Sequence, residues 1–221
     1  MVLLRSEKNI KQIKNAVSKK KFSYKQQETI EYALDIGLND DELELIINRK
    51  LSSEQMLEGI YGFMCGLQVI DVEQYLKPDF SIEVIRQLRL SLMKSNERQL
   101  VPLMINSKFN LKQIIEIRKG SFLPIEYVKL YACPYFSANQ MAQIRMGFEN
   151  KINYKIMSYL CNCRLSVNQL KYLRSMAELG MDESIIHEIA KPEIPEESMF
   201  QILKNLKQQR KCNELRKKMI A

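Results

Sequence analysis

Hydrophobic and polar positions along the chain follow the period of an α-helix, and one segment shows the pattern most completely. Met141, Ile144 and Phe148 are spaced i, i+3 and i+7, so they share one face of a helix. Ser137, followed three residues later by Gln140, forms a capping box, in which the two side chains satisfy free amides of the first helical turn. The segment therefore predicts a helix that starts at Ser137 and buries one apolar stripe.

Copies of this start signal recur along the chain, each preceded by an apolar residue. The equivalent positions are Ser23, Ser52, Ser81, Asn110, Ser137, Ser166 and Pro195. They are separated by 29, 29, 29, 27, 29 and 29 residues. A glutamine follows most caps at the third position, but Val84 replaces it after Ser81. This register predicts an internal repeat of about 29 residues.

Each repeat has the pattern of two helices. A glycine followed by an apolar residue ends the first helix at Gly37, Gly66 and Gly180, because glycine readily adopts the left-handed conformation. A proline stops the shorter second helix at Pro78, Pro134 and Pro192. Neither helix can bury its stripe alone, so neighbouring repeats must stack. The sequence predicts an all-α fold, an α-solenoid of about six two-helix repeats.

The two ends and one internal copy depart from this pattern. Residues 1–22 predict a basic N-terminal capping helix, residues 23–194 the repeat array, and residues 195–221 a basic C-terminal capping helix. The copy that begins at Asn110 lacks the usual corner, and its first helix is expected to break early, near Gly120. A kink or a local change of curvature is expected there.

Charge is spread unevenly over the 221 residues, whose formal net charge is +8. Residues 1–22 hold seven basic and one acidic side chain, and residues 195–221 hold seven and three. Residues 23–80 hold four basic and twelve acidic side chains, and residues 81–194 hold sixteen and ten. The basic character therefore belongs to the two ends and to the second half, while residues 23–80 are acidic.

Other features concern the setting of the protein. The longest apolar runs are too short to span a bilayer, and the first residues lack a secretory signal. Five cysteines, an odd number, fit reduced thiols better than a disulfide framework. We therefore expect a cytoplasmic protein that does not associate with membranes.

Motifs for catalysis are not evident in the sequence. It contains no phosphate loop, nucleophile elbow or metalloprotease helix. His187 is the only histidine, and the sequence suggests no residue to orient it as a base. Cys133, Cys161 and Cys163 suggest a zinc site or, with better support, small packing residues, because their spacing is unusual for structural zinc. We expect no enzyme activity, no metal and no cofactor.

Four arginines stand eight residues after successive caps, namely Arg89, Arg118, Arg145 and Arg174. Stacked repeats would align them as an arginine ladder with a spacing of about 8–10 Å, suited to phosphates or an acidic protein surface. Alternatively, Glu149 and Glu178 pair with the arginines four residues before them. The basic run Lys19, Lys20 and Lys21 has a similar pair of interpretations, a solvated helix end or a partner-binding patch.

One copy also resembles a known kind of repeat. The string Ser137-x-x-Gln140-Met141-x-x-Ile144-Arg145-x-Gly147-Phe148-Glu149, with Tyr131-Ala132-Cys133-Pro134 before it, resembles helical repeats in proteins of phages and mobile elements of Gram-positive bacteria. The resemblance covers residues 23–194 at most and is good in this copy alone. It implies an interaction module and carries over no catalytic residue.

Two functions are therefore expected, and both concern binding. The first is a non-enzymatic module that binds a protein partner. In a phage or mobile element it would inhibit a host defence enzyme or a nucleic-acid-processing enzyme. The alternative is direct nucleic-acid binding through the basic ends and the arginine ladder. The oligomeric state, the partner and the binding face are left open by the sequence.

Overall fold

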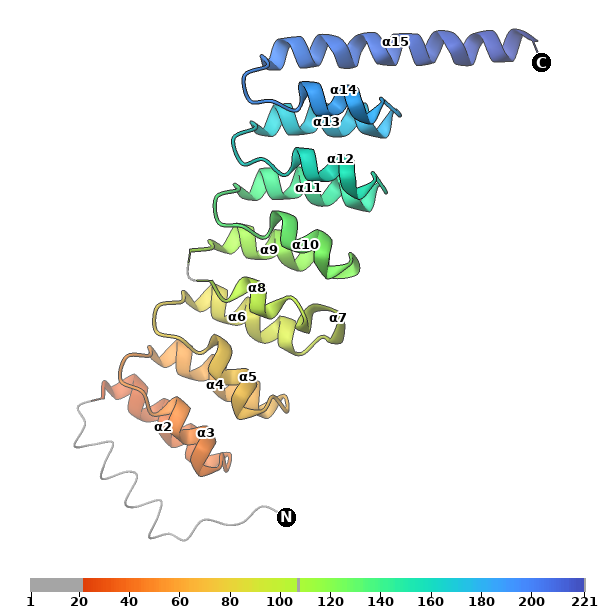
Figure 1. Cartoon of the computed structure of the whole chain (residues 1–221). Coiled ribbons are helices and arrows are strands. Elements are labelled where there is room, and N and C mark those ends of the chain that lie inside the picture. The colour runs from red at the N-terminus through yellow and green to blue at the C-terminus, as the bar shows by residue number, and fades with distance from the viewer. Residues whose placement is uncertain (1–21, 107, 221) are drawn as a thin grey trace. The chain divides into compact units, whose positions relative to one another are not determined.

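The computed structural model describes residues 22–106 and 108–220, with side chains described as far as Arg216 (Figure 1). Every regular element in these ranges is a helix and none is a strand, which confirms the all-α prediction. None of these helices is long and apolar enough to cross a membrane. The helices form two compact units: the first ends at Leu111 and the second begins at Lys112.

The first unit packs its helices in two layers. Its elements are α2 (Tyr24–Asp35), α3 (Asp40–Ile46), α4 (Ser53–Met64), α5 (Val69–Tyr75), α6 (Ile82–Leu92), α7 (Ser95–Arg98) and α8 (Val101–Met104). The longer helix α4 packs against both α2 and α6, and the shorter helix α3 packs against α5. Equivalent helices of successive repeats therefore lie side by side (Figure 1).

The second unit follows the same plan. Its elements are α9 (Leu111–Lys119), the 3₁₀ helix η1 (Gly120–Phe122), α10 (Ile125–Tyr131), α11 (Ala138–Glu149), α12 (Tyr154–Leu160), α13 (Val167–Glu178), α14 (Glu183–Ile189) and α15 (Glu196–Ile220). Helix α13 packs against α11 and α15, and α12 packs against α14. The first helices of its repeats thus form one layer and the second helices the other.

The predicted helix starts are confirmed. The side chains of Ser23, Ser52, Ser81, Ser137 and Ser166 each accept a hydrogen bond from an amide of the first turn. Four of these caps are complete capping boxes, and Ser81 lacks the box because valine stands three residues later. Helices α9 and α15 begin directly after Asn110 and Pro195.

The capping glutamines have a second role that the local sequence pattern did not predict. The Nε2 atom of Gln55 donates to the backbone carbonyls of Pro78 and Phe80, at 3.4 and 2.7 Å. These carbonyls belong to the loop that leads into the next repeat. Equivalent bonds are made by Gln26, Gln113, Gln140 and Gln169. The glutamine therefore joins its own helix start to the following loop, whereas Val84 has no donor for this role.

The buried stripe is also as predicted. Four residues after each cap, from the second repeat onward, stands an apolar side chain that has no exposed surface. These residues are Met56, Ile85, Ile114, Met141, Leu170 and Met199. Burial of each such side chain contributes about 1.5–3 kcal/mol relative to leaving it exposed. They place the core between the two helix layers of each unit.

All three glycine corners predicted after the first helices are confirmed. Gly37, Gly66 and Gly180 have φ angles of 83°, 84° and 80°, in the left-handed region. Lys151 occupies the equivalent corner after α11 and also has a positive φ, 61°. A side chain with a Cβ is strained in this conformation.

Two repeats differ from the regular helix pair. The second helix expected in the repeat after α6 is present as α8, which buries Val101 and Met104. One further short helix, α7, precedes it, and Pro102 in the first turn of α8 favours a separate helix start. The early end of the next first helix is confirmed, since α9 stops at Lys119 and η1 follows at Gly120.

Candidate protein-interaction surface

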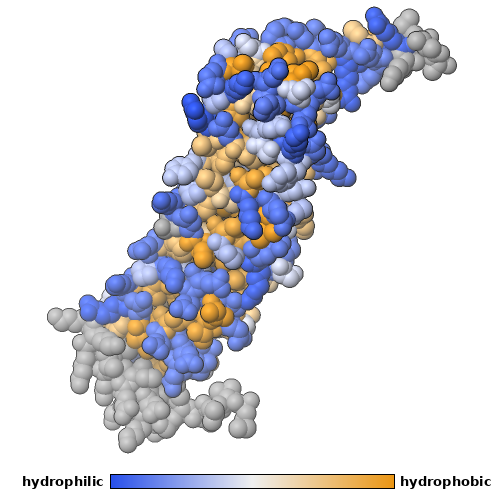
Figure 2. All heavy atoms as spheres, in the orientation of Figure 1, coloured by the Kyte–Doolittle hydropathy of each residue, from blue (hydrophilic) through white to orange (hydrophobic). Residues whose placement is uncertain are grey.

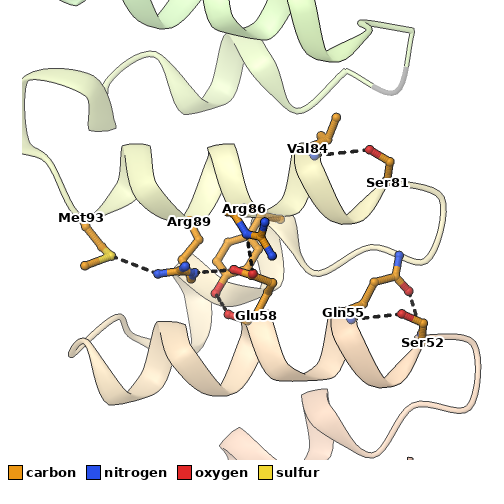
Figure 3. Close-up of polar contacts among 9 residues, drawn as sticks. Ser52, Gln55, Glu58, Ser81, Val84, Arg86, Arg89 and Met93 are labelled. Carbon is orange, nitrogen blue, oxygen red and sulfur yellow. Dashed lines mark hydrogen bonds and ion pairs between the residues drawn. The ribbon is translucent and has the colours of Figure 1, made fainter.

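Three arginines of the ladder, Arg89, Arg145 and Arg174, lie against the preceding repeat rather than free in solvent. In the first unit, Glu58 accepts two hydrogen bonds, both of 2.8 Å (Figure 3). Arg89 Nε donates to its Oε2 atom, and Arg86 Nε donates to its Oε1 atom. The Glu58 side chain is only 4% exposed, and that of Arg89 is 12% exposed. This hydrogen bond and the Glu58 charge raise the pKa of Arg86. The two arginines of α6 therefore neutralise a carboxylate buried on α4.

The second unit makes a similar bridge from equivalent positions. Arg145 on α11 contacts Glu116 on α9 at 3.1 Å, and it also pairs with Glu149 at 2.6 Å. Burial disfavours the charged guanidinium of Arg145, but Glu149 and Glu116 outweigh it, so its pKa is raised. One step further, Arg174 binds Gln143 at 3.2 Å and pairs with Glu178.

These contacts follow one rule along the chain. The group that receives the arginine stands six residues after the cap of the preceding repeat. The intrahelical partners Glu149 and Glu178 were anticipated from sequence, but the bridging groups Glu58, Glu116 and Gln143 were missed. Their constant place in the repeat was the available signal.

The candidate binding residues are therefore not equally available. The side chains of Arg145 and Arg174 are 13% and 11% exposed, close to the value for Arg89. Arg118 is half-buried and also has an interaction partner. Lys19, Lys20 and Lys21 lie outside the described residues. A role of these residues in partner binding stays a prediction, while three of the arginines visibly hold neighbouring helices together.

A different surface of the first unit is exposed and apolar. We name Tyr32, Tyr61, Met64 and Met93 the aromatic–methionine row; their exposed fractions are 37%, 41%, 56% and 44%. The Tyr32 hydroxyl donates to Met64 Sδ at 3.6 Å. These residues stand nine or twelve residues after their caps, so they share one face of the first helices.

Arg89 joins the row to the buried ion pair beneath it. Its guanidinium carbon lies 5.8 Å from the centre of the Tyr61 ring. Its Nη1 donates to Met93 Sδ at 3.5 Å (Figure 3). The row therefore runs over α2, α4 and the end of α6 as one connected feature. Figure 2 shows apolar side chains, in orange, gathered among hydrophilic ones on the visible face of the molecule.

Acidic side chains border this row. Glu28, Glu31 and Asp35 on α2 and Glu54 on α4 are all exposed. Glu28 and Glu54 line an open hollow of about 340 Å³ between the two helices, together with Tyr32 and one basic side chain, Lys25. An exposed apolar row with acidic edges is typical of a site that receives a protein segment carrying apolar and basic groups.

Helix α15 has the opposite charge. Its first half packs on α13 through Met199 and Leu203, which are 0% and 5% exposed. From Lys207 to Arg216 every residue is exposed. An open hollow of about 400 Å³ on one face is lined by Phe200 and Leu203 and by the lysines Lys204, Lys207 and Lys211. This face combines apolar groups with a row of positive charges.

The residues considered for catalysis and metal binding lie in ordinary environments. His187 is exposed and its ring lies 4.6 Å from that of Tyr159. Burial raises the pKa of the Cys161 thiol to about 12, which keeps it protonated near neutral pH. Within residues 22–106 and 108–220, no three His, Cys, Asp or Glu side chains are grouped as metal ligands.

Comparisons with protein families, with curated proteins and with solved structures find no match to this chain.

Proposed function

We propose that the protein is a non-enzymatic module that binds another protein through the aromatic–methionine row. The observation that carries this proposal is the exposure of two tyrosines and two methionines, connected across three neighbouring helices. Aromatic and methionine side chains are enriched at protein interfaces because they bury much apolar area. Methionine also adapts its shape to a partner at little cost.

The architecture that we propose for this module is one α-solenoid. Helix pairs related by the 29-residue register would continue through both units as about six repeats, with a capping helix at each end. A cytoplasmic setting fits the odd number of cysteines. By the resemblance to repeats of phage and mobile-element proteins, the partner would be a host defence enzyme or a nucleic-acid-processing enzyme that this module inhibits.

The test is affinity capture with the full chain, after nuclease treatment of the lysate. A row variant, Tyr61→Ser with Met64→Ser, removes apolar surface from the row and should lose at least tenfold of the captured protein, about 1.4 kcal/mol. The matched control is Phe122→Ser with Tyr135→Ser, since these side chains are 89% and 78% exposed and lie outside the row. Capture that is equal for both variants would contradict the proposal.

Direct nucleic-acid binding is a second candidate function, favoured by the lysine face of α15. Its affinity should fall steeply with salt, because each phosphate contact releases counterions. Replacing Lys204, Lys207 and Lys211 with glutamate should abolish a gel shift at low salt. Glutamine at Arg89, Arg118, Arg145 and Arg174 should weaken binding to all nucleic-acid sequences if the ladder takes part. A wild-type chain that shifts no nucleic acid at low salt excludes this function.

A further inference from the structure

Two surfaces of this chain are complementary in charge, and each exposes apolar groups. The aromatic–methionine row has acidic borders on α2 and α4. The free face of α15 places Lys204, Lys207 and Lys211 beside Phe200, which is 43% exposed, and Leu215 is 53% exposed further along the same helix. We propose that α15 of one copy docks on the aromatic–methionine row of a second copy.

The sizes of the two surfaces agree. Fifteen residues of helix separate Phe200 from Leu215, which corresponds to about 22 Å at 1.5 Å per residue. The row extends over the neighbouring helices α2, α4 and α6, and two helix spacings span about 16–20 Å. One helix laid across the row can therefore reach all three helices.

The chemistry of the contact follows from the exposed groups. Phe200 supplies an aromatic side chain to the methionines, whose sulfur atoms contact rings favourably. Lys204, Lys207 and Lys211 face the exposed carboxylates Glu28 and Glu54. Such rim charges guide encounter and set orientation, and they are weakened by salt, while the apolar row provides the buried centre.

The contact joins different surfaces of the two copies, so each copy keeps one unused surface. Interfaces of this kind extend into open chains unless the rotation closes a ring. The protein should therefore associate more as its concentration rises and return to its monomer mass of 26.0 kDa at high salt. This inference rests on the proposed binding role of the row, and it makes α15 a competitor for any other partner there.

The experiment uses two full-length variants, each with one surface disabled. The tail variant is Lys204→Gln with Lys207→Gln and Lys211→Gln, so that its neutral tail does not complement the lysines of the border variant. The border variant is Glu28→Lys with Glu31→Lys and Glu54→Lys. All six side chains are exposed, so helical circular dichroism should match that of the wild type. Sedimentation velocity then gives the mass of each variant alone and of their mixture.

The expected result is specific to a head-to-tail contact. Each variant alone should be monomeric, with apparent affinity reduced at least tenfold. The mixture should form a 1:1 complex and no larger species, because only one functional interface remains. A mixture that stays monomeric, or a wild-type chain that is monomeric at all concentrations and at low salt, overturns the inference.

The outcomes also separate this inference from the proposed function. If the wild type is monomeric but the Tyr61→Ser with Met64→Ser variant still loses its captured protein, the function stands and the self-contact does not. If the wild type stays monomeric and the tail variant loses a nucleic-acid gel shift, the inference fails, and α15 instead binds nucleic acid. Loss of both self-association and capture in the row variant supports the two together.

Discussion

Both units pair an arginine with a buried carboxylate of the preceding repeat, but they surround that arginine with different residues. Arg145 in the second unit has two carboxylates, Glu116 from the preceding repeat and Glu149 on its own helix. Arg89 in the first unit has one, Glu58, and at the place of Glu149 it meets the thioether of Met93. In the second unit the arginine is therefore flanked by a second carboxylate, whereas in the first unit it is flanked by an exposed methionine. The surface that we propose for binding arises at this difference.

The buried tyrosines below these arginines show a second contrast. The hydroxyl of Tyr75 donates to the backbone carbonyl of Glu58 at 3.1 Å, and that of Tyr131 is buried without a hydrogen-bond partner. Burial strongly raises the pKa of both phenols, so both stay neutral. Helix α4 continues past the contact, but α9 ends at Lys119 and gives way to η1. The repeat that contains η1 therefore retains a buried tyrosine, Tyr131, but the hydroxyl of this tyrosine makes no hydrogen bond.

The largest expected effect comes from removing Glu58. Glu58→Ala leaves Arg89 without its carboxylate in a site where the arginine side chain is 12% exposed, and it should cost about 3–5 kcal/mol in unfolding free energy. Glu116→Ala should cost less, because Arg145 keeps Glu149. Urea denaturation of both variants measures the difference. Glu54→Ala, an exposed change on α4, is the control and should change stability by less than about 0.5 kcal/mol.

Equal losses for Glu58→Ala and Glu116→Ala would contradict the contrast between the two units. The comparison requires that both variants stay two-state, which the slope of unfolding free energy against urea concentration reports. Charge-neutral Glu58→Gln should fall between the wild type and Glu58→Ala, since an amide oxygen still accepts from Arg89, as Gln143 does from Arg174.

The next effect concerns two glycines packed against the tyrosines. A Cβ at Gly62 would lie 2.1 Å from the Tyr75 hydroxyl, and one at Gly120 would lie 2.0 Å from that of Tyr131. Gly62→Ala and Gly120→Ala should each cost about 1–3 kcal/mol by overpacking. Adding Tyr131→Phe should restore the stability of Gly120→Ala almost fully, because the removed hydroxyl had no partner.

Denaturation of these single and double variants forms two mutant cycles that can be compared directly. Adding Tyr75→Phe to Gly62→Ala should restore less, because it also removes the hydrogen bond to Glu58. If the two double variants recover equally, the hydrogen bond of Tyr75 contributes nothing measurable and this second contrast fails.

The tyrosines alone provide a smaller test of the same contrast. Tyr75→Phe should lower unfolding free energy by about 1 kcal/mol, the usual net value of a buried hydrogen bond. Tyr131→Phe should be neutral or stabilising, because it removes a buried hydroxyl without a partner. Thermal and urea unfolding of the two variants measure the sign directly. A loss in Tyr131→Phe as large as in Tyr75→Phe would contradict the geometry at η1.

Local features of the chain were predictable, and contacts between repeats were not. Ser137 and Met141 belong to one helical segment, so capping and helical spacing fix their roles without knowledge of the neighbours. The pairing of Arg89 with Glu58, 31 residues earlier in the chain, depends on how two different helices are aligned. The exposure of Met64 could not be read from residue type, because methionine is usually buried. Only the packed layers show which face stays open.

The smallest expected effect exchanges the residues that distinguish the two units. Met93→Glu would give Arg89 the partner that Arg145 has in Glu149, and should raise unfolding free energy by about 0.3–0.5 kcal/mol. Glu149→Met should lower it by a similar amount. Glu149 is 39% exposed, so solvent screening keeps both values small, and both should shrink in high salt.

Met93→Glu tests the comparison through binding as well as through stability. It removes one apolar group from the aromatic–methionine row and adds a carboxylate, so it should weaken capture of an apolar partner while stabilising the fold. Glu149→Met makes the reverse change in the second unit and should leave capture at the row unchanged. A variant that gains stability and loses binding separates the two roles, because a folding defect would lower both. If Met93→Glu binds as well as the wild type, the apolar end of the row is not part of the interface.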